Sequence, residues 1–118
     1  MQYVLLIAVD DSDGTQLPAD SEAELMAEYG TFTAALQSAG AMRGGARLRP
    51  SASATTLRVR DGEALITDGP FAETKEHLGG YYVIEAADLD EALAWAAKIP
   101  GARFGSVEVR PIWEPDAS

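Results

Sequence analysis

The sequence predicts an α+β sandwich, in which two helices cover one face of a largely antiparallel sheet. Strand-like and helix-like segments follow one another in the order strand, helix, strand, hairpin, strand, helix, strand. Two long helices set between strands are typical of such a sandwich. The length of 118 residues suffices for one core, so residues 1–118 are expected to form a single domain with a polar tail over 113–118.

The first strand and the first helix are marked most clearly. Residues 3–9 form a continuous apolar run, which predicts a central strand with both of its faces covered. Ser21 and Glu24 have the spacing of a capping box, which predicts that a helix begins there. Gly40 is expected to end this helix after about five turns. The apolar positions of its buried face are Leu25, Tyr29, Phe32 and Leu36.

The middle of the chain is expected to hold an edge strand and a hairpin. Gly44 and Gly45 favour a bulge in an edge strand within residues 41–50. Apolar and polar residues alternate before and after Asp61 and Gly62 within residues 55–67, which predicts a hairpin with a two-residue turn.

Two further strands and a second helix complete the pattern. The strands are expected over residues 81–86 and 106–113. Asp88 and Glu91 form a cap-like pair before the second helix. The buried face of this helix is expected to consist of Ala92, Trp95, Ala96 and Ile99.

Two helices on one face leave the other face of the sheet bare. Tyr81, Val83, Val107 and Val109 would form this bare face together with one side of the first strand. Monomers rarely expose an apolar patch of that size. The sequence therefore predicts a homodimer in which two sheets pack face to face.

Composition narrows the possible partners and chemistry. The chain has 19 acidic and nine basic residues and a net charge of −10, which disfavours binding to nucleic acid. Five arginines between Arg43 and Arg60 are interpreted as a solvated or salt-bridged sheet face. The chain has no cysteine and one histidine, so neither a metal site nor a redox cofactor is expected. The acidic run over residues 10–14 does not match a calcium loop. With no signal sequence and no membrane span, the cytoplasm is the expected compartment.

The loop over residues 67–80 is the first candidate for a site because ionisable side chains are concentrated there. Asp68 is a candidate general base, or alternatively the acceptor that holds a turn. His77 is a candidate proton shuttle, or alternatively a solvated histidine. Glu73 could assist His77, and Lys75 could bind an anionic ligand, although both residue types are common on solvated loops.

Three residues outside this loop are further candidates for binding a ligand. Tyr29 lies on the apolar face of the first helix, so a packed tyrosine with a bonded hydroxyl is the alternative. Tyr82 is a candidate near the cleft between helix and sheet, although Tyr81 and Tyr82 point to opposite faces and at most one of them can line a given cavity. Arg58 could pair with a ligand carboxylate or with a neighbouring acidic residue.

The loop also carries a resemblance to a known family. Residues 68–76 (Asp-Gly-Pro-Phe-Ala-Glu-Thr-Lys-Glu) and 78–82 (Leu-Gly-Gly-Tyr-Tyr) resemble the DGPF-domain branch of the YCII-related family. Four further segments support this resemblance, namely residues 3–7, 29–40, 88–93 and 105–111. The resemblance implies a ferredoxin-like fold that dimerises into an α+β barrel.

The resemblance also bears on function. The wider family is associated with a site made of a histidine and an aspartate, and lyase or dehalogenating activity is attributed to some members. This chain departs from that arrangement: its histidine, His77, follows Asp68 in the loop, and the first strand is followed by aspartates. We expect a small-molecule-binding or acid/base enzyme site at the 67–80 cleft. The alternative is a non-catalytic regulatory module, because DGPF proteins occur together with extracytoplasmic-function sigma factors.

Overall fold

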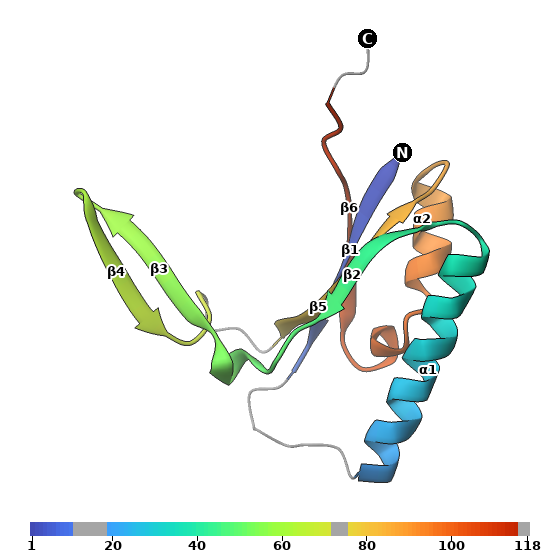
Figure 1. The fold of residues 1–118 in the computed structure, drawn as a ribbon, viewed down its shortest axis with the longest axis horizontal. Helices are drawn as coiled ribbons and strands as arrows, with labels where there is room; N and C mark the ends of the chain where they lie inside the picture. The colour runs from blue at the N-terminus through green and yellow to red at the C-terminus, as the bar shows by residue number, and fades with distance from the viewer. Residues whose placement is uncertain (11–18, 72–75, 116–118) are drawn as a thin grey trace.

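The computed structural model describes residues 1–10, 19–71 and 76–115, with the backbone alone described at 19–20. The order of the elements confirms the predicted one (Figure 1). They are β1 (Gln2–Val9), α1 (Ala19–Ser38), β2 (Met42–Arg47), the 3-10 turn η1 (Ser51–Ser53), β3 (Thr55–Arg60), β4 (Glu63–Asp68), β5 (His77–Glu85), α2 (Leu89–Ala96), the 3-10 turn η2 (Pro100–Arg103) and β6 (Ser106–Pro111). None of the helices in the described ranges is long and apolar enough to cross a membrane.

Four strands form the main sheet in the order β2-β5-β1-β6, and every neighbouring pair is antiparallel. Both helices cover the same face of this sheet (Figure 1), so the predicted ferredoxin-like α+β fold is confirmed. β1 is central, as predicted, but the chain covers one of its faces. Tyr3, Leu5 and Ile7 are buried toward the helices, whereas Val4 and Leu6 are half-buried on the opposite face.

The predicted helix faces are largely confirmed. On α1, Phe32 and Leu36 are buried, while Leu25 and Tyr29 are half-buried. The Phe32 ring is 5.1 Å from the Tyr82 ring and 6.1 Å from the Trp95 ring, both in edge contact. Phe32 therefore joins α1 to both the sheet and α2.

The helix ends follow the predicted caps with one exception. The Asp88 carboxylate accepts a hydrogen bond from the Glu91 N–H at 2.9 Å at the start of α2. Gly40 has φ +69 just after α1, which is the left-handed conformation expected of a terminating glycine. The predicted start of α1 at Ser21 is wrong, because the helix begins at Ala19.

One part of the predicted bare face is also wrong. Val107 pairs with Ile7, and Val109 pairs with Leu5, so both valines pack under the helices against the core. Tyr81 and Val83 pair instead with Leu6 and Val4, on the uncovered face as predicted. The physical reason is register: odd-numbered residues of β6 lie opposite odd-numbered residues of β1, whereas those of β5 lie opposite even-numbered ones.

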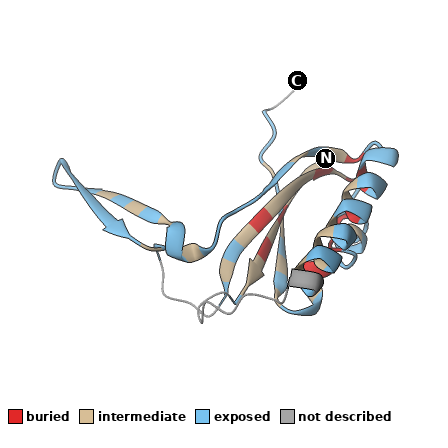
Figure 2. Cartoon of the chain, turned by 60° about the horizontal axis from the view of Figure 1, so that its bottom comes forward, coloured by how far each residue is buried: buried red, intermediate tan, exposed pale blue. Residues whose placement is uncertain are grey.

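β3 and β4 form a separate two-stranded sheet, here called the arm (residues 55–68). The arm projects away from the helices and the main sheet (Figure 1), and most of its surface is exposed (Figure 2). Asp61 and Gly62 both have positive φ at its tip, which confirms the predicted hairpin turn.

Candidate functional site

A cavity of about 340 Å³ lies between α1 and the main sheet, and its lining is mostly apolar. β1, α1, β2 and β5 all contribute to it. The lining residues are Ile7, Val9, Leu25, Met26, Tyr29, Thr33, Met42, Gly45, Ala46, Arg47, Gly79, Gly80 and Tyr82. This cavity is the strongest candidate for a binding site in the described part of the chain.

Three of the lining residues, Gly45, Gly79 and Gly80, are glycines of the sheet. A Cβ atom at Gly45 would lie 2.8 Å from the Tyr81 carbonyl oxygen, and one at Gly80 would lie 2.9 Å from that of Ala46. Gly79 is the extra residue of a bulge between β1 and β5. β2 and β5 thus run too close together at Gly45 and Gly80 for a side chain, so these two positions contribute only backbone to the lining. The sequence shows glycines at these positions but does not show that they line the same cavity.

Two groups of hydroxyls lie in the lining. The Tyr29 hydroxyl accepts a hydrogen bond from the Gly101 N–H at 3.1 Å. The Thr33 and Tyr82 hydroxyls are 2.9 Å apart and bond to each other. Burial raises the pKa of Tyr29, and the bond from Gly101 acts in the opposite direction. Tyr29 is therefore a neutral phenol at physiological pH.

Arg47 is the single charged residue among the described lining residues. It lies at the end of β2 and reaches α1, where its guanidinium group contacts the Met26 sulfur at 3.4 Å and the Glu22 carboxylate at 3.3 Å. The side chains of Arg47 and Glu22 are 65% and 47% exposed, so this ion pair lies at the surface. Arg47 thus places a positive charge at the edge of an apolar cavity, a role that sequence analysis missed because it grouped Arg47 with the surface arginines.

The structure brings two of the predicted ligand-binding residues together, because Tyr29 and Tyr82 both line the cavity. His77 begins β5 opposite Val9, which is a lining residue. Asp68 ends β4 and is exposed on the arm, so the structure does not bring it to the cavity. Glu73 and Lys75 lie outside the described residues.

Arg58 lies on the arm, and the Asp-Gly-Pro-Phe stretch (residues 68–71) begins at the last residue of the arm. The Gly69 N–H donates to the Ala54 carbonyl at 2.7 Å, and the Thr56 hydroxyl donates to the Gly69 carbonyl at 2.8 Å. The Arg58 guanidinium group donates to the Phe71 carbonyl at 3.0 Å. These bonds tie the stretch after β4 to β3 and close the base of the arm.

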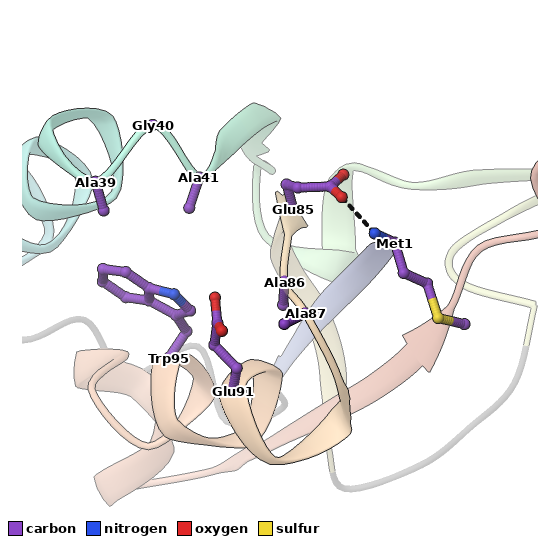
Figure 3. Close-up of a pocket in the computed structure, with 9 residues that line it drawn as sticks. All are labelled: Met1, Ala39, Gly40, Ala41, Glu85, Ala86, Ala87, Glu91 and Trp95. Atoms are coloured by element: carbon purple, nitrogen blue, oxygen red, sulfur yellow. Dashed lines mark hydrogen bonds and ion pairs between the residues drawn. The ribbon is translucent and has the colours of Figure 1, made fainter.

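A second hollow of about 340 Å³ lies at the end of the sheet where β1 begins (Figure 3). Trp95 and Glu91 extend from α2 toward it, and Glu85 accepts a hydrogen bond from the Met1 ammonium group. That bond raises the pKa of the ammonium group. The hollow opens more widely to solvent than the α1 cavity, so it is the weaker candidate.

Metal binding finds no support in the part of the chain that the structure describes, where no three histidine, aspartate or glutamate side chains gather in a suitable cluster.

Comparison with known proteins places the chain in a family. The family model of the YCII-related domain matches residues 1–116. An uncharacterized protein of Rhizobium meliloti (strain 1021) is 40% identical over 114 residues, which cover 95% of this chain and 92% of that protein. Both matches span nearly the whole sequence, and the family model includes every element of the fold described above. The chain belongs to the YCII-related family.

Proposed function

We propose that this protein binds a small molecule with an apolar body and an anionic end in the cavity between α1 and the sheet. The observation that carries the proposal is the combination of a mostly apolar cavity with one charged lining residue, Arg47. The volume of about 340 Å³ is at the lower end of the usual range for small-molecule sites.

The cavity suits the apolar body of such a ligand. Met26 and Leu25 supply apolar contacts from α1, and Ile7 and Val9 supply them from β1. The lining glycines allow a flat group to approach the backbone of β2 and β5 closely. Tyr29 offers a phenol hydroxyl as the polar group that orients the ligand inside.

Arg47 suits the anionic end. A guanidinium group binds a carboxylate through two parallel hydrogen bonds, which gives both affinity and orientation. Its present partner, Glu22, is about half exposed, and surface ion pairs contribute about 0–1 kcal/mol. An incoming carboxylate can therefore replace Glu22 at small cost.

Binding without turnover is favoured over acid/base catalysis. Asp68 lies on the arm, and the described lining contains no carboxylate and no histidine. An acid/base step in this cavity would depend on His77, which lies beside the lining residue Val9. The regulatory alternative is supported by the arm, on which Leu57, Val59 and Ile66 are exposed.

The test compares small carboxylates with their uncharged amides. Benzoate, 3-phenylpropionate and hexanoate are titrated into ¹⁵N-labelled protein, and amide shifts at Gly79, Gly80 and Tyr82 report on the cavity. Arg47→Met keeps the apolar stem and removes the charge, so acid binding should weaken about 10–100-fold. Binding of the amides should change little.

Arg43→Met is the matched control, since Arg43 lies on β2 and donates to the Gly40 carbonyl without lining the cavity. It should leave acid binding unchanged. Equal affinity for acids and amides, or shifts confined to residues away from the cavity, would contradict the proposal.

A further inference from the structure

The Tyr29 hydroxyl has a hydrogen-bonding function that its own chain leaves unused. Its oxygen accepts a hydrogen bond from the Gly101 N–H at 3.1 Å. A phenol also carries one hydrogen that it can donate, and none of the residues that the structure describes accepts it. Burial raises the pKa of Tyr29, so this hydrogen is present at neutral pH. The mostly apolar cavity therefore offers a hydrogen-bond donor to a ligand.

The other two hydroxyls of the lining differ in this respect. The Thr33 and Tyr82 hydroxyls are 2.9 Å apart, so one of them donates to the other. A threonine in a helix can turn its own hydrogen toward the carbonyl one turn earlier, in which case Tyr82 donates to Thr33 and both hydrogens are used. Tyr29 is therefore the lining hydroxyl that is best suited to donate to a ligand.

The Tyr29 hydroxyl lies across the cavity from Arg47. A Cβ atom at Gly101 would lie 2.6 Å from the Tyr29 oxygen and 3.0 Å from a methyl carbon of Ile7, so this hydroxyl lies next to β1. Arg47 is the last residue of β2, and β5 runs between β2 and β1. Neighbouring strands are about 4.8 Å apart, so β1 and β2 are about 10 Å apart. The guanidinium group and the phenol therefore lie at two different ends of the cavity.

We propose that the ligand of this cavity is an oxo acid, whose carboxylate pairs with Arg47 and whose carbonyl oxygen accepts a hydrogen bond from Tyr29. A carbonyl oxygen has lone pairs and no hydrogen, so it matches a hydroxyl whose oxygen already accepts from Gly101. This inference rests on the proposed binding of an anionic ligand in the cavity, and it adds the second polar group of that ligand.

The same geometry determines the length and the selectivity that we expect. Hydrogen bonds of about 2.9 Å at both ends leave about 4–5 Å between the two polar groups of the ligand. The oxo acid 5-oxohexanoate has about this spacing, and 4-oxopentanoate and 6-oxoheptanoate are one carbon shorter and one carbon longer. A site that hydrogen-bonds a ligand group rejects an analogue without this group, because the polar group of the site is then left unpaired. Such an analogue is 5-methylhexanoate, in which a methyl group replaces the carbonyl oxygen.

The first test measures the affinities of 5-oxohexanoate and 5-methylhexanoate for the unaltered protein and for Tyr29→Phe by NMR titration. The ratio of the two affinities is compared between the proteins, so that the difference in apolar burial between the two ligands cancels. Tyr29→Phe removes the donor and keeps the ring, so the ratio in favour of the oxo acid should fall about 5–30-fold. Of the three oxo acids, 5-oxohexanoate should bind most tightly.

Two further tyrosine variants locate the donor. Tyr81→Phe is the matched control, because Tyr81 lies on the uncovered face of the sheet and does not line the cavity. It should leave the ratio of affinities unchanged. Tyr82→Phe removes the other phenol of the lining and should also leave the ratio nearly unchanged, since Tyr82 is bonded to Thr33.

A second measurement does not depend on a variant. The ketone carbon of 5-oxohexanoate is labelled with ¹³C, and its resonance moves upfield when the oxygen loses its hydrogen bonds, as it does on transfer from water to an apolar solvent. In the complex with the unaltered protein, this resonance should stay close to its position in water. A position close to that in an apolar solvent would mean that no donor meets the carbonyl oxygen.

The results separate a failure of this inference from a failure of the proposed function. If Arg47→Met weakens binding of the acids but Tyr29→Phe leaves the ratio unchanged, the cavity binds a carboxylate and the oxo-acid inference alone is overturned. A ratio that falls in Tyr82→Phe and not in Tyr29→Phe would overturn the assignment of the donor to Tyr29. If none of the acids binds, or if Arg47→Met has no effect, both proposals are overturned.

Discussion

Gly101 shows how much a single missing methyl group determines in this molecule. A Cβ atom at Gly101 would lie 2.6 Å from the Tyr29 hydroxyl oxygen and 3.0 Å from a methyl carbon of Ile7. Both of those residues line the α1 cavity. Because Gly101 has no side chain, η2 can approach α1 closely enough for the Gly101 N–H to donate to the Tyr29 hydroxyl. In the sequence, Gly101 is visible only as part of a helix stop.

Gly101→Ala should destabilise the fold by about 1–3 kcal/mol, because the added methyl group must displace Tyr29 or the backbone of η2. Urea unfolding at pH 7 measures this change. Gly30→Ala is the matched control, since a Cβ atom at Gly30 meets nothing within 4 Å. In the middle of α1 it should stabilise the protein by about 0.5–1 kcal/mol. Equal effects of the two substitutions would mean that η2 has room to move.

Tyr29 should also make stability depend on alkaline pH. Burial raises its pKa in the folded state, so its stabilising effect is complete below the unfolded pKa of about 10 and is lost as pH rises through the folded pKa. At pH 7, Tyr29→Phe should cost about 1 kcal/mol, because the Gly101 N–H loses its acceptor. Urea unfolding from pH 7 to 11 should show this difference shrinking above pH 10. Parallel curves for the two proteins would contradict the expectation.

At the scale of elements, the sequence predicted correctly the turns and helix ends that depend on neighbouring residues alone. The Asp61-Gly62 turn, the Asp88 cap and the Gly40 terminus each depend on a few neighbouring residues, and all three are confirmed. The start of α1 was wrong by two residues, because a capping-box spacing does not fix where the first turn forms.

Strand pairing limited the predictions that depend on long-range contacts. Val107 and Val109 alternate with polar residues, which fits valines on either face of the sheet. Only the register of β6 with β1 decides whether they face the helices or the uncovered side. The same limit applies to the cavity, whose lining requires Gly45 of β2 to pair with Tyr82 of β5, and Arg47 to pair with Gly80. Tyr29 and Tyr82 were predicted because each lies on a recognisable apolar face. Arg47 was missed because nothing local distinguishes it from the other arginines of its segment.

At the scale of the whole molecule, the chain divides into a body that holds the core and the cavity, and an arm that contributes to neither. The described lining of the cavity comes from β1, α1, β2 and β5, and none of it lies within residues 55–68. The Asp-Gly-Pro-Phe stretch lies at the junction, where Gly69 bonds to Ala54. This division predicts that folding and ligand binding by the body can be separated from the arm.

Removing the arm tests that separation. The Gly69 N–H and the Ala54 carbonyl are 2.7 Å apart, so an Asn-Gly turn can replace residues 55–68 without moving the two ends. The shortened protein should unfold in urea within about 1 kcal/mol of the full-length protein, since the removed residues contribute nothing to the buried core. It should bind the carboxylates with unchanged affinity, because no lining residue is removed. Loss of near-UV circular dichroism, or weaker carboxylate binding, would show instead that the arm stabilises the body.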